Sequence, residues 1–250
     1  MASNDMADRS SDNKPLAVLI DAENVQLSVV SAVLDEIAKF GNVTVKRAYG
    51  DFTMPPLQPW RAAMLSLAIQ PMQQFRNING KSVTDSALII DAMDLLHGGR
   101  VEGFCIVSSD SDFTRLVTRA RENGLAVYGF GEKKTPLAFV NACTKFIYTE
   151  FLRPEAEPAV IATKVKVTRP KPPLGLLRTA IEAAEEETGW ANLGAVGTAI
   201  SDHHPDFDAR TYGFAKLSSL IKASGIAEYR LAGEEGGPKQ AFVKLREPSS

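Results

Sequence analysis

The chain has 250 residues, 44% of them hydrophobic and 23% charged, and its net charge is -2. This length allows one large domain or two smaller ones, and no apolar run approaches the roughly 20 residues of a membrane span. The near-zero charge excludes a uniformly basic nucleic-acid binder but not a local binding site.

Residues 1–14 are polar and predict a disordered tail rather than a signal peptide. The two cysteines, Cys105 and Cys143, lie inside apolar segments. Cysteines in such settings are typical of core thiols in a reducing compartment. We therefore expect a cytoplasmic protein with no membrane partner.

Residues 15–153 alternate short apolar runs with helical patterns, which is typical of βα units and a parallel sheet. Strands are predicted at 16–20, 43–50, 71–76, 103–109, 125–130 and 145–149. Helices are predicted at 27–39, 57–69, 83–97, 112–123 and 135–142. The expected fold is α/β, a Rossmann-like parallel sheet with helices on both faces.

Acidic residues follow two of these strands. Asp21 ends the first strand and Asp110 ends the fourth. A doubly wound order of 3-2-1-4-5 makes these strands neighbours, and ligands bind at the carboxyl ends of strands where the order reverses. Asp112 lies two residues after Asp110 near the next helix, where capping that helix is its alternative role.

The helix predicted at 83–97 carries two further acids. Asp85 lies in its first turn, and Asp91 is displaced from it by a net rotation of about 240°, so the two cannot share a face. We favour Asp85 for the site, because Lys81 and the loop before it lie at the same edge. Asp91 is expected to anchor neighbouring backbone or to pair locally.

Carboxylates that converge without a nearby histidine favour Mg²⁺ or Mn²⁺ over zinc. A carboxylate cluster around such an ion is a phosphodiesterase design, so the candidate catalytic residues and metal ligands are Asp21, Asp85, Asp110 and Asp112. The candidate substrate contacts at the rim are Asn24, Arg76, Lys81, Ser109 and Lys133. The alternatives are helix capping for Asn24 and plain solvation for the lysines.

Residues 154–173 are Pro-rich and basic, and predict an inter-domain linker. Beyond it, helices are predicted at 174–187, 192–201 and 209–224, followed by two strands around a Gly-rich turn within 226–246. This pattern indicates a small winged-helix domain over residues 174–247.

Three motifs in order, IDAEN, KSVTDSALIIDAMDLL and IVSSDSDFTRLV, resemble the NYN domain of the PIN-like nucleases, which includes the bacterial LabA group. The resemblance covers about residues 15–150. It implies a PIN-like fold and metal-dependent ribonuclease activity, with the acidic positions falling on Asp21, Asp85, Asp110 and Asp112. It also matches Asn24 to the family's amide and Asp91 to its second helical acid.

The stretch from Trp190 to Gly225, followed by 241-AFVKLR-246, resembles the OST-HTH/LOTUS domain. That resemblance implies RNA binding and, in some relatives, protein docking. The candidate RNA contacts are Arg210, Tyr212, Lys216 and Lys222. The alternative is that the aromatic residue belongs to the core and the basic side chains are solvated.

The leading hypothesis is a Mg²⁺- or Mn²⁺-dependent endoribonuclease whose C-terminal module binds RNA. One alternative is a non-catalytic RNA-binding regulator with the same fold, and another is a C-terminal adaptor that docks a protein partner. A phosphatase of the haloacid dehalogenase type is set aside, because it needs a second aspartate where Glu23 stands. The sequence admits a homo-oligomer without requiring one.

Overall fold

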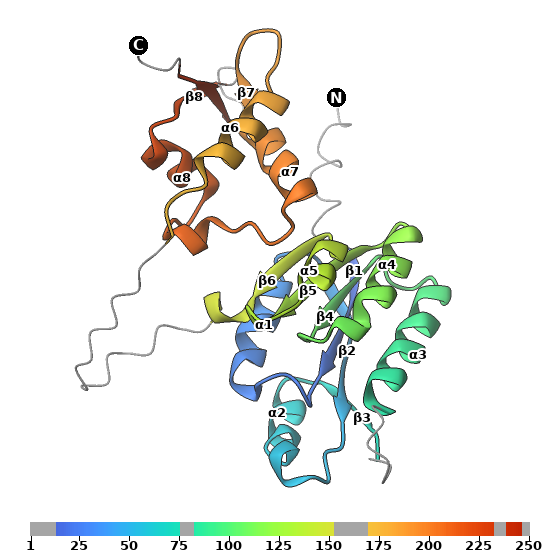
Figure 1. The fold of residues 1–250 in the computed structure, drawn as a ribbon. Helices are drawn as coiled ribbons and strands as arrows, with labels where there is room; N and C mark the ends of the chain where they lie inside the picture. The colour runs from blue at the N-terminus through green and yellow to red at the C-terminus, as the bar shows by residue number, and fades with distance from the viewer. Residues whose placement is uncertain (1–13, 76–82, 153–169, 233–238, 247–250) are drawn as a thin grey trace, which may run out of the picture. The chain divides into compact units, whose positions relative to one another are not determined.

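The computed structural model describes residues 14–75, 83–152, 170–232 and 239–246. The chain divides into two compact units, residues 1–157 and residues 158–250, which we call the N-terminal and C-terminal units. Figure 1 shows an α/β sandwich for the first unit and a helical bundle with a small sheet for the second. In the described part of the chain, no helix is both long and apolar enough to span a bilayer.

The N-terminal unit is built on a parallel sheet whose six described strands run in the order β3-β2-β1-β4-β5-β6. The strands are β1 (Pro15–Asp21), β2 (Asn42–Gly50), β3 (Gln70–Gln73), β4 (Gly103–Val107), β5 (Ala126–Gly131) and β6 (Lys145–Tyr148). Leu16–Ile20 of β1 pairs in parallel with Gly103–Val107 of β4. The predicted adjacency of the first and fourth strands is therefore confirmed.

Helices cover both faces of this sheet (Figure 1). One face carries α1 (Val30–Ile37) and α2 (Trp60–Ser66), and the other carries α3 (Val83–His97), α4 (Thr114–Glu122) and α5 (Leu137–Ala142). Alternate residues of β1 are fully buried in the two cores, Val18 on the first side and Leu19 on the second. Burial on both faces explains why the first strand is a continuous apolar run.

The second helix is shorter than predicted. The prediction placed it at 57–69, whereas α2 spans Trp60–Ser66 and follows a separate 3-10 turn at Pro55–Leu57. Prolines at 55, 56 and 59 lack the N–H that a continuous helix would use there, so the regular helix begins only after them. Strand β3 ends at Gln73, and residue 76, the last of its predicted span, lies outside the described residues.

A polar clamp fixes α3 on the sheet. The carboxylate of Asp91 on α3 accepts hydrogen bonds from Arg47 and Tyr49, both on β2. Tyr49 is fully buried, and burial together with Asp91 raises its pKa, so its hydroxyl remains a donor. The expectation that Asp91 pairs locally is wrong, because its partners lie more than forty residues earlier on β2. The clamp sets the position of the helix whose first turn carries Asp85.

The C-terminal unit contains α6 (Leu174–Ala183), α7 (Leu193–His203), a 3-10 helix at Ala209–Tyr212 and α8 (Leu217–Ser224). Its antiparallel sheet consists of β7 (Ala191–Asn192), β8 (Ala227–Ala232) and β9 (Gln240–Leu245), in the order β7-β9-β8. The two predicted strands are confirmed as β8 and β9, and β7 was not predicted. The winged-helix expectation agrees with this combination of helices and a small sheet.

The predicted helix at 209–224 is wrong, because the structure divides it in two. Asp208 caps the first piece by accepting a hydrogen bond from the Arg210 backbone N–H. Gly213 then adopts a left-handed φ of 88°, which glycine reaches without steric cost. Lys216 is extended and precedes α8. These backbone states end one helix and begin another within four residues.

Candidate metal centre

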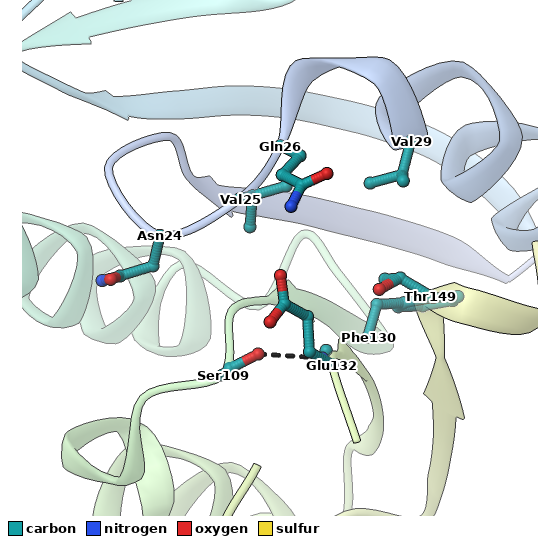
Figure 2. Close-up of a pocket in the computed structure, with 9 residues that line it drawn as sticks. Asn24, Val25, Gln26, Val29, Ser109, Phe130, Glu132 and Thr149 are labelled. Carbon is teal, nitrogen blue, oxygen red and sulfur yellow. Dashed lines mark hydrogen bonds between the residues drawn. The ribbon is translucent and has the colours of Figure 1, made fainter. Parts of the chain in front are cut away.

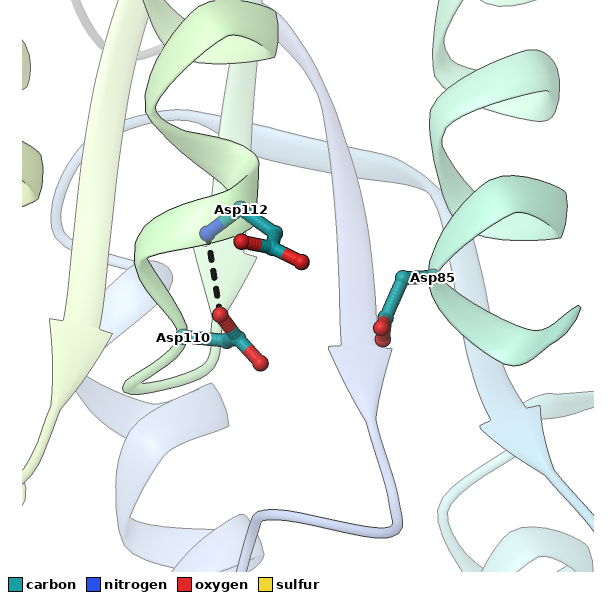
Figure 3. Close-up of side chains that lie close together, drawn as sticks. All are labelled: Asp85, Asp110 and Asp112. Atoms are coloured by element: carbon teal, nitrogen blue, oxygen red, sulfur yellow. Dashed lines mark hydrogen bonds between the residues drawn. The ribbon is translucent and has the colours of Figure 1, made fainter. Parts of the chain in front are cut away.

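Three aspartates converge at the carboxyl edge of the N-terminal sheet. Asp110 follows β4, Asp112 lies in the 3-10 turn at Ser111–Phe113, and Asp85 projects from the first turn of α3. One carboxylate oxygen of each lies within 4.8 Å of the others, and Figure 3 shows Asp85 facing the loop that carries the other two. The convergence lies where the adjacency of β1 and β4 predicted a site.

Hydrogen bonds hold the loop after β4 in place. The Asp112 backbone N–H donates to Oδ1 of Asp110 at 2.9 Å, so Asp110 caps the turn (Figure 3). The Asp110 backbone N–H donates in turn to the Ser108 hydroxyl oxygen at 3.1 Å. The capping role considered for Asp112 therefore belongs to Asp110, and Asp112 is exposed with its carboxylate at the cluster.

Asp21 lies behind this cluster and is completely buried. Its carboxylate accepts hydrogen bonds from the Asn24 side-chain amide and the Ser108 hydroxyl, both at 2.8 Å, and from the backbone N–H groups of Glu23 and Asn24. Burial raises the pKa of Asp21, and these hydrogen bonds oppose that rise. Asp21 thus lies outside the group of three whose oxygens approach one another.

Negative charge accumulates around Asp85. Burial raises the pKa of Asp85 to about 6, with smaller contributions in the same direction from Asp21, Asp110, Asp112 and Glu23. Like charges at short range disfavour ionisation of the group between them. A cation at the cluster would relieve this repulsion.

The family model for the NYN domain matches residues 15–151, which is more than half of the chain. The chain belongs to the NYN domain family. A second model, for the OST-HTH/LOTUS domain, matches residues 169–234. The sequence resemblances to both domains are therefore confirmed, and the chain joins a PIN-like nuclease domain to an RNA-binding module.

Comparison with curated proteins gives no match. Among solved structures, a protein of unknown function from Vibrio parahaemolyticus is 19% identical with a TM-score of 0.46, over 55% of this chain and 94% of that one. An uncharacterized protein from Nitrosomonas europaea is 29% identical with a TM-score of 0.31, over 39% and 91%. The WlbA dehydrogenase from Bordetella pertussis is 14% identical with a TM-score of 0.32, over 70% and 41%.

Two predicted rim residues of the NYN domain, Ser109 and Asn24, are engaged in structural contacts. The Ser109 hydroxyl accepts a hydrogen bond from the Glu132 backbone N–H at 2.8 Å, and Asn24 binds Asp21 rather than capping a helix. Both line a narrow pocket of about 10 Å³ with Glu132 (Figure 2). That volume holds about one water molecule and is too small for a nucleobase.

The predicted basic rim is only partly described. Lys133 is exposed, and its ammonium lies 5.0 Å from the centroid of the Phe151 ring. Arg76 and Lys81 lie outside the described residues. Of the three predicted basic rim residues, Lys133 is thus the one that lies among the described residues.

Three of the four predicted RNA contacts of the LOTUS domain have intramolecular partners. The Arg210 guanidinium binds the Asp208 carboxylate, with Nη2 and Oδ2 at 2.5 Å. Tyr212 packs on the core and lies 5.9 Å from the Phe207 ring, which agrees with the core alternative. The Lys222 ammonium lies 3.6 Å from the centroid of the Tyr229 ring, and Lys216 is exposed at the start of α8.

Sequence reasoning missed Ser108 as a part of the site. This hydroxyl is completely buried and links Asp21 to the Asp110 backbone. The available signal was its place at the end of β4, beside the end of β1, where a buried hydroxyl needs a polar partner.

Proposed function

We propose that this protein is a metal-dependent endoribonuclease, in which the NYN domain cleaves RNA phosphodiester bonds and the LOTUS domain retains the RNA. The observation that carries the proposal is the convergence of Asp85, Asp110 and Asp112 at the carboxyl edge of the sheet. RNA is favoured as the substrate because an RNA-binding module accompanies the nuclease domain in one chain.

The residues present fit a hard divalent cation. Only carboxylates form the described cluster, and Mg²⁺ and Mn²⁺ prefer such oxygen ligands. Burial raises the pKa of Asp85 most, and the negative charges of the neighbouring acids raise it further, so a bound cation would be stabilised there. Asp85, Asp110 and Asp112 would hold the ion. When bound, Mg²⁺ or Mn²⁺ lowers the pKa of an attacking water and neutralises charge that develops on the phosphate.

The protein's own hydrogen bonds keep the ligands in position. Asp110 is held at both its backbone N–H and its Oδ1, so its second carboxylate oxygen has a fixed direction. Asp21 fixes Ser108 and the loop after β1, and it adds negative charge behind Asp85. We assign Asp21 a positioning role in place of the direct ligation expected from its sequence position.

Substrate phosphates would meet the rim of the same edge. Lys133, Arg76 and Lys81 are our proposed phosphate contacts, because lysine and arginine supply most such contacts in nucleic-acid complexes. Asn24 and Ser109 are assigned to the architecture of the rim, because their side chains already hold the ends of β1 and β5.

The test is cleavage of labelled single-stranded RNA and of a DNA strand of the same sequence, with Mn²⁺, Mg²⁺ or EDTA. Asp110→Asn removes the charge but keeps a residue that caps equally well. Asp94→Asn is the matched control, because Asp94 is an exposed acid farther along α3. We expect internal cleavage of RNA by the wild type and by Asp94→Asn, and none by Asp110→Asn or in EDTA.

Cleavage that persists in EDTA, or in Asp110→Asn at the wild-type rate, contradicts the proposal. RNA binding with no cleavage under any metal condition favours the non-catalytic regulator instead. Preferential cleavage of DNA would assign the same site to a different substrate.

A further inference from the structure

One face of the sheet in the C-terminal unit does not pack against the hydrophobic core of that unit. Phe242 lies on the central strand β9 and pairs in register with Asn192 of β7 and Arg230 of β8. Cross-strand partners in an antiparallel sheet place their side chains on the same face. Val243, the next residue, is fully buried in the core of the unit. Phe242 and Arg230 therefore belong to the opposite, outward face.

Two aromatic rings lie on this face around one arginine. The guanidinium carbon of Arg230 lies over Trp190, 4.0 Å from the ring centroid, and 5.6 Å from the centroid of Phe242. Both rings are partly exposed and Arg230 is exposed. We call Trp190, Arg230 and Phe242 the wing platform.

The aromatic residues of the platform differ from the others of this unit. The rest pack against the hydrophobic core, namely Phe207, Tyr212, Phe214 and Tyr229. Trp190 and Phe242 are not among the residues that form or cover that core. Their rings contribute to the outer surface of the sheet, and tryptophan side chains are enriched at interaction surfaces.

The charges around the platform are mixed. Lys244 is exposed on the same strand face, two residues after Phe242, and faces Glu228 across the strand pair. A face that carries both signs does not form the continuous basic track that phosphate binding alone requires. What it offers is flat aromatic surface and a planar cation, which match the faces of nucleobases.

We propose that the wing platform stacks unpaired bases of single-stranded RNA. Unstacked bases bind to aromatic rings and to Arg guanidinium planes, and such stacking tolerates sequence variation because every base has a π face. This inference rests on the proposed function in that RNA is the substrate. It moves the predicted RNA contacts from Arg210, Tyr212, Lys216 and Lys222 to the outer face of the sheet.

Trp190 provides its own reporter. The chain has two tryptophans, and Trp60 is 2% exposed inside the N-terminal unit. Full-length protein carrying Asp110→Asn is titrated in EDTA with a single-stranded oligoribonucleotide and with an abasic strand of equal length. Binding is followed by fluorescence anisotropy of the labelled strand and by tryptophan emission. The absence of metal and the Asn substitution separate binding from cleavage.

We expect quenching of tryptophan emission by the RNA strand, none by the abasic strand, and no quenching in a Trp190→Phe variant. Arg230→Ala should weaken binding about tenfold, which lies in the lower part of the range for loss of one stacked base. Arg230→Lys keeps the charge but loses the planar group, so it should weaken binding nearly as much. Arg178→Ala is the matched control, an exposed arginine on α6 in the same unit.

Equal affinity for the abasic strand, or binding without any change in emission, would overturn the wing platform. The wing platform would also be overturned if Lys222→Ala weakened RNA binding and Arg230→Ala did not. RNA would then bind at α8, which carries Lys222, and not at the outer face of the sheet. Binding and quenching in a protein that never cleaves RNA would overturn the proposed nuclease while leaving the platform intact. Binding of a protein partner that is blocked by Arg230→Ala, with no binding of RNA, would assign the face to another class of ligand.

Discussion

Asp85→Asn is expected to stabilise the N-terminal unit at pH 8 when EDTA is present. In the native state, burial and, to a smaller extent, the neighbouring acids raise the pKa of Asp85 to about 6 from an ordinary value of 3.8. At pH 8 the carboxylate is ionised in both the folded and the unfolded chain, so folding brings a charge into a repulsive site. Asparagine fills the same space without that charge.

The size of the effect follows from the shift in pKa. A difference of about two units corresponds to about 3 kcal/mol as an upper bound. Asp85 is only partly buried, and solvent screening reduces the gain to about 1 kcal/mol, or about 3–5 °C in the melting temperature of a domain of this size. Because the folded pKa is the higher one, wild-type stability contributed by Asp85 is lost as pH rises from about 4 to about 6.

The assay is thermal unfolding followed by Trp60 fluorescence in a Trp190→Phe background, so that only the N-terminal unit reports. Wild type, Asp85→Asn and the control Asp94→Asn are compared in EDTA at pH 4.5 and pH 8. The advantage of Asp85→Asn should be larger at pH 8, and Mn²⁺ should raise the wild-type midpoint but not that of Asp85→Asn. A variant that is less stable than wild type at pH 8 in EDTA would refute the electrostatic reasoning.

Asp21→Asn should lower the free energy of unfolding by about 2–4 kcal/mol more than Asp110→Asn. The carboxylate of Asp21 accepts hydrogen bonds from the Asn24 amide and the Ser108 hydroxyl, and the NH₂ group of an asparagine in its place cannot accept them. Urea unfolding in EDTA measures this, and equal stability of the two variants would argue against it. Burial raises the pKa of the Cys143 thiol to about 12 and that of Cys105 as well. Neither thiol should therefore react with an aromatic disulfide reagent at pH 8 until urea unfolds the chain, and fast reaction of the native protein would show that they are accessible. Tyr49→Phe removes a hydroxyl donor from the clamp on α3 and should cost about 1–2 kcal/mol by urea unfolding, whereas no loss would mean that the clamp does not stabilise the helix.

The architecture of the N-terminal unit follows from local patterns and general rules of chain topology. Apolar runs such as that of β1 indicate strands covered on both faces, and the doubly wound order then places the ends of β1 and β4 together. The rotation between Asp85 and Asp91 along the helix correctly predicted that they lie on different faces of α3. Asp85 joins the carboxylate cluster, and Asp91 faces β2.

The finer geometry of the site depends on partners that are distant in sequence. Asp21 is saturated with hydrogen bonds because Ser108, 87 residues away, donates to it beside the Asn24 amide. From the sequence, either Asp110 or Asp112 could cap the turn that follows β4. The path of the backbone makes Asp110 the cap, because it brings the Asp112 N–H to the Asp110 carboxylate. Asp91 finds its partners 42 and 44 residues earlier on β2, which no helical pattern encodes.

The C-terminal unit was harder to predict for a related reason. The apolar spacing predicted one helix across Gly213, because the pattern of apolar residues does not reveal that this glycine adopts a left-handed φ and ends the helix. The outer face of the sheet depends on β7, a strand of two residues that is too short to show alternation. Trp190 precedes that strand, so its position beside Arg230 emerges only from the three-dimensional pairing.

The central claim is that Asp85, Asp110 and Asp112 together hold the divalent ion on which RNA cleavage depends. Its most direct test is the single-turnover rate of cleavage of a single-stranded RNA in Mn²⁺, for wild type, Asp110→Asn and Asp94→Asn. We predict a loss of about 100-fold or more for Asp110→Asn, which corresponds to several kcal/mol of lost transition-state stabilisation, and no loss for Asp94→Asn. Equal rates for wild type and Asp110→Asn would contradict the account.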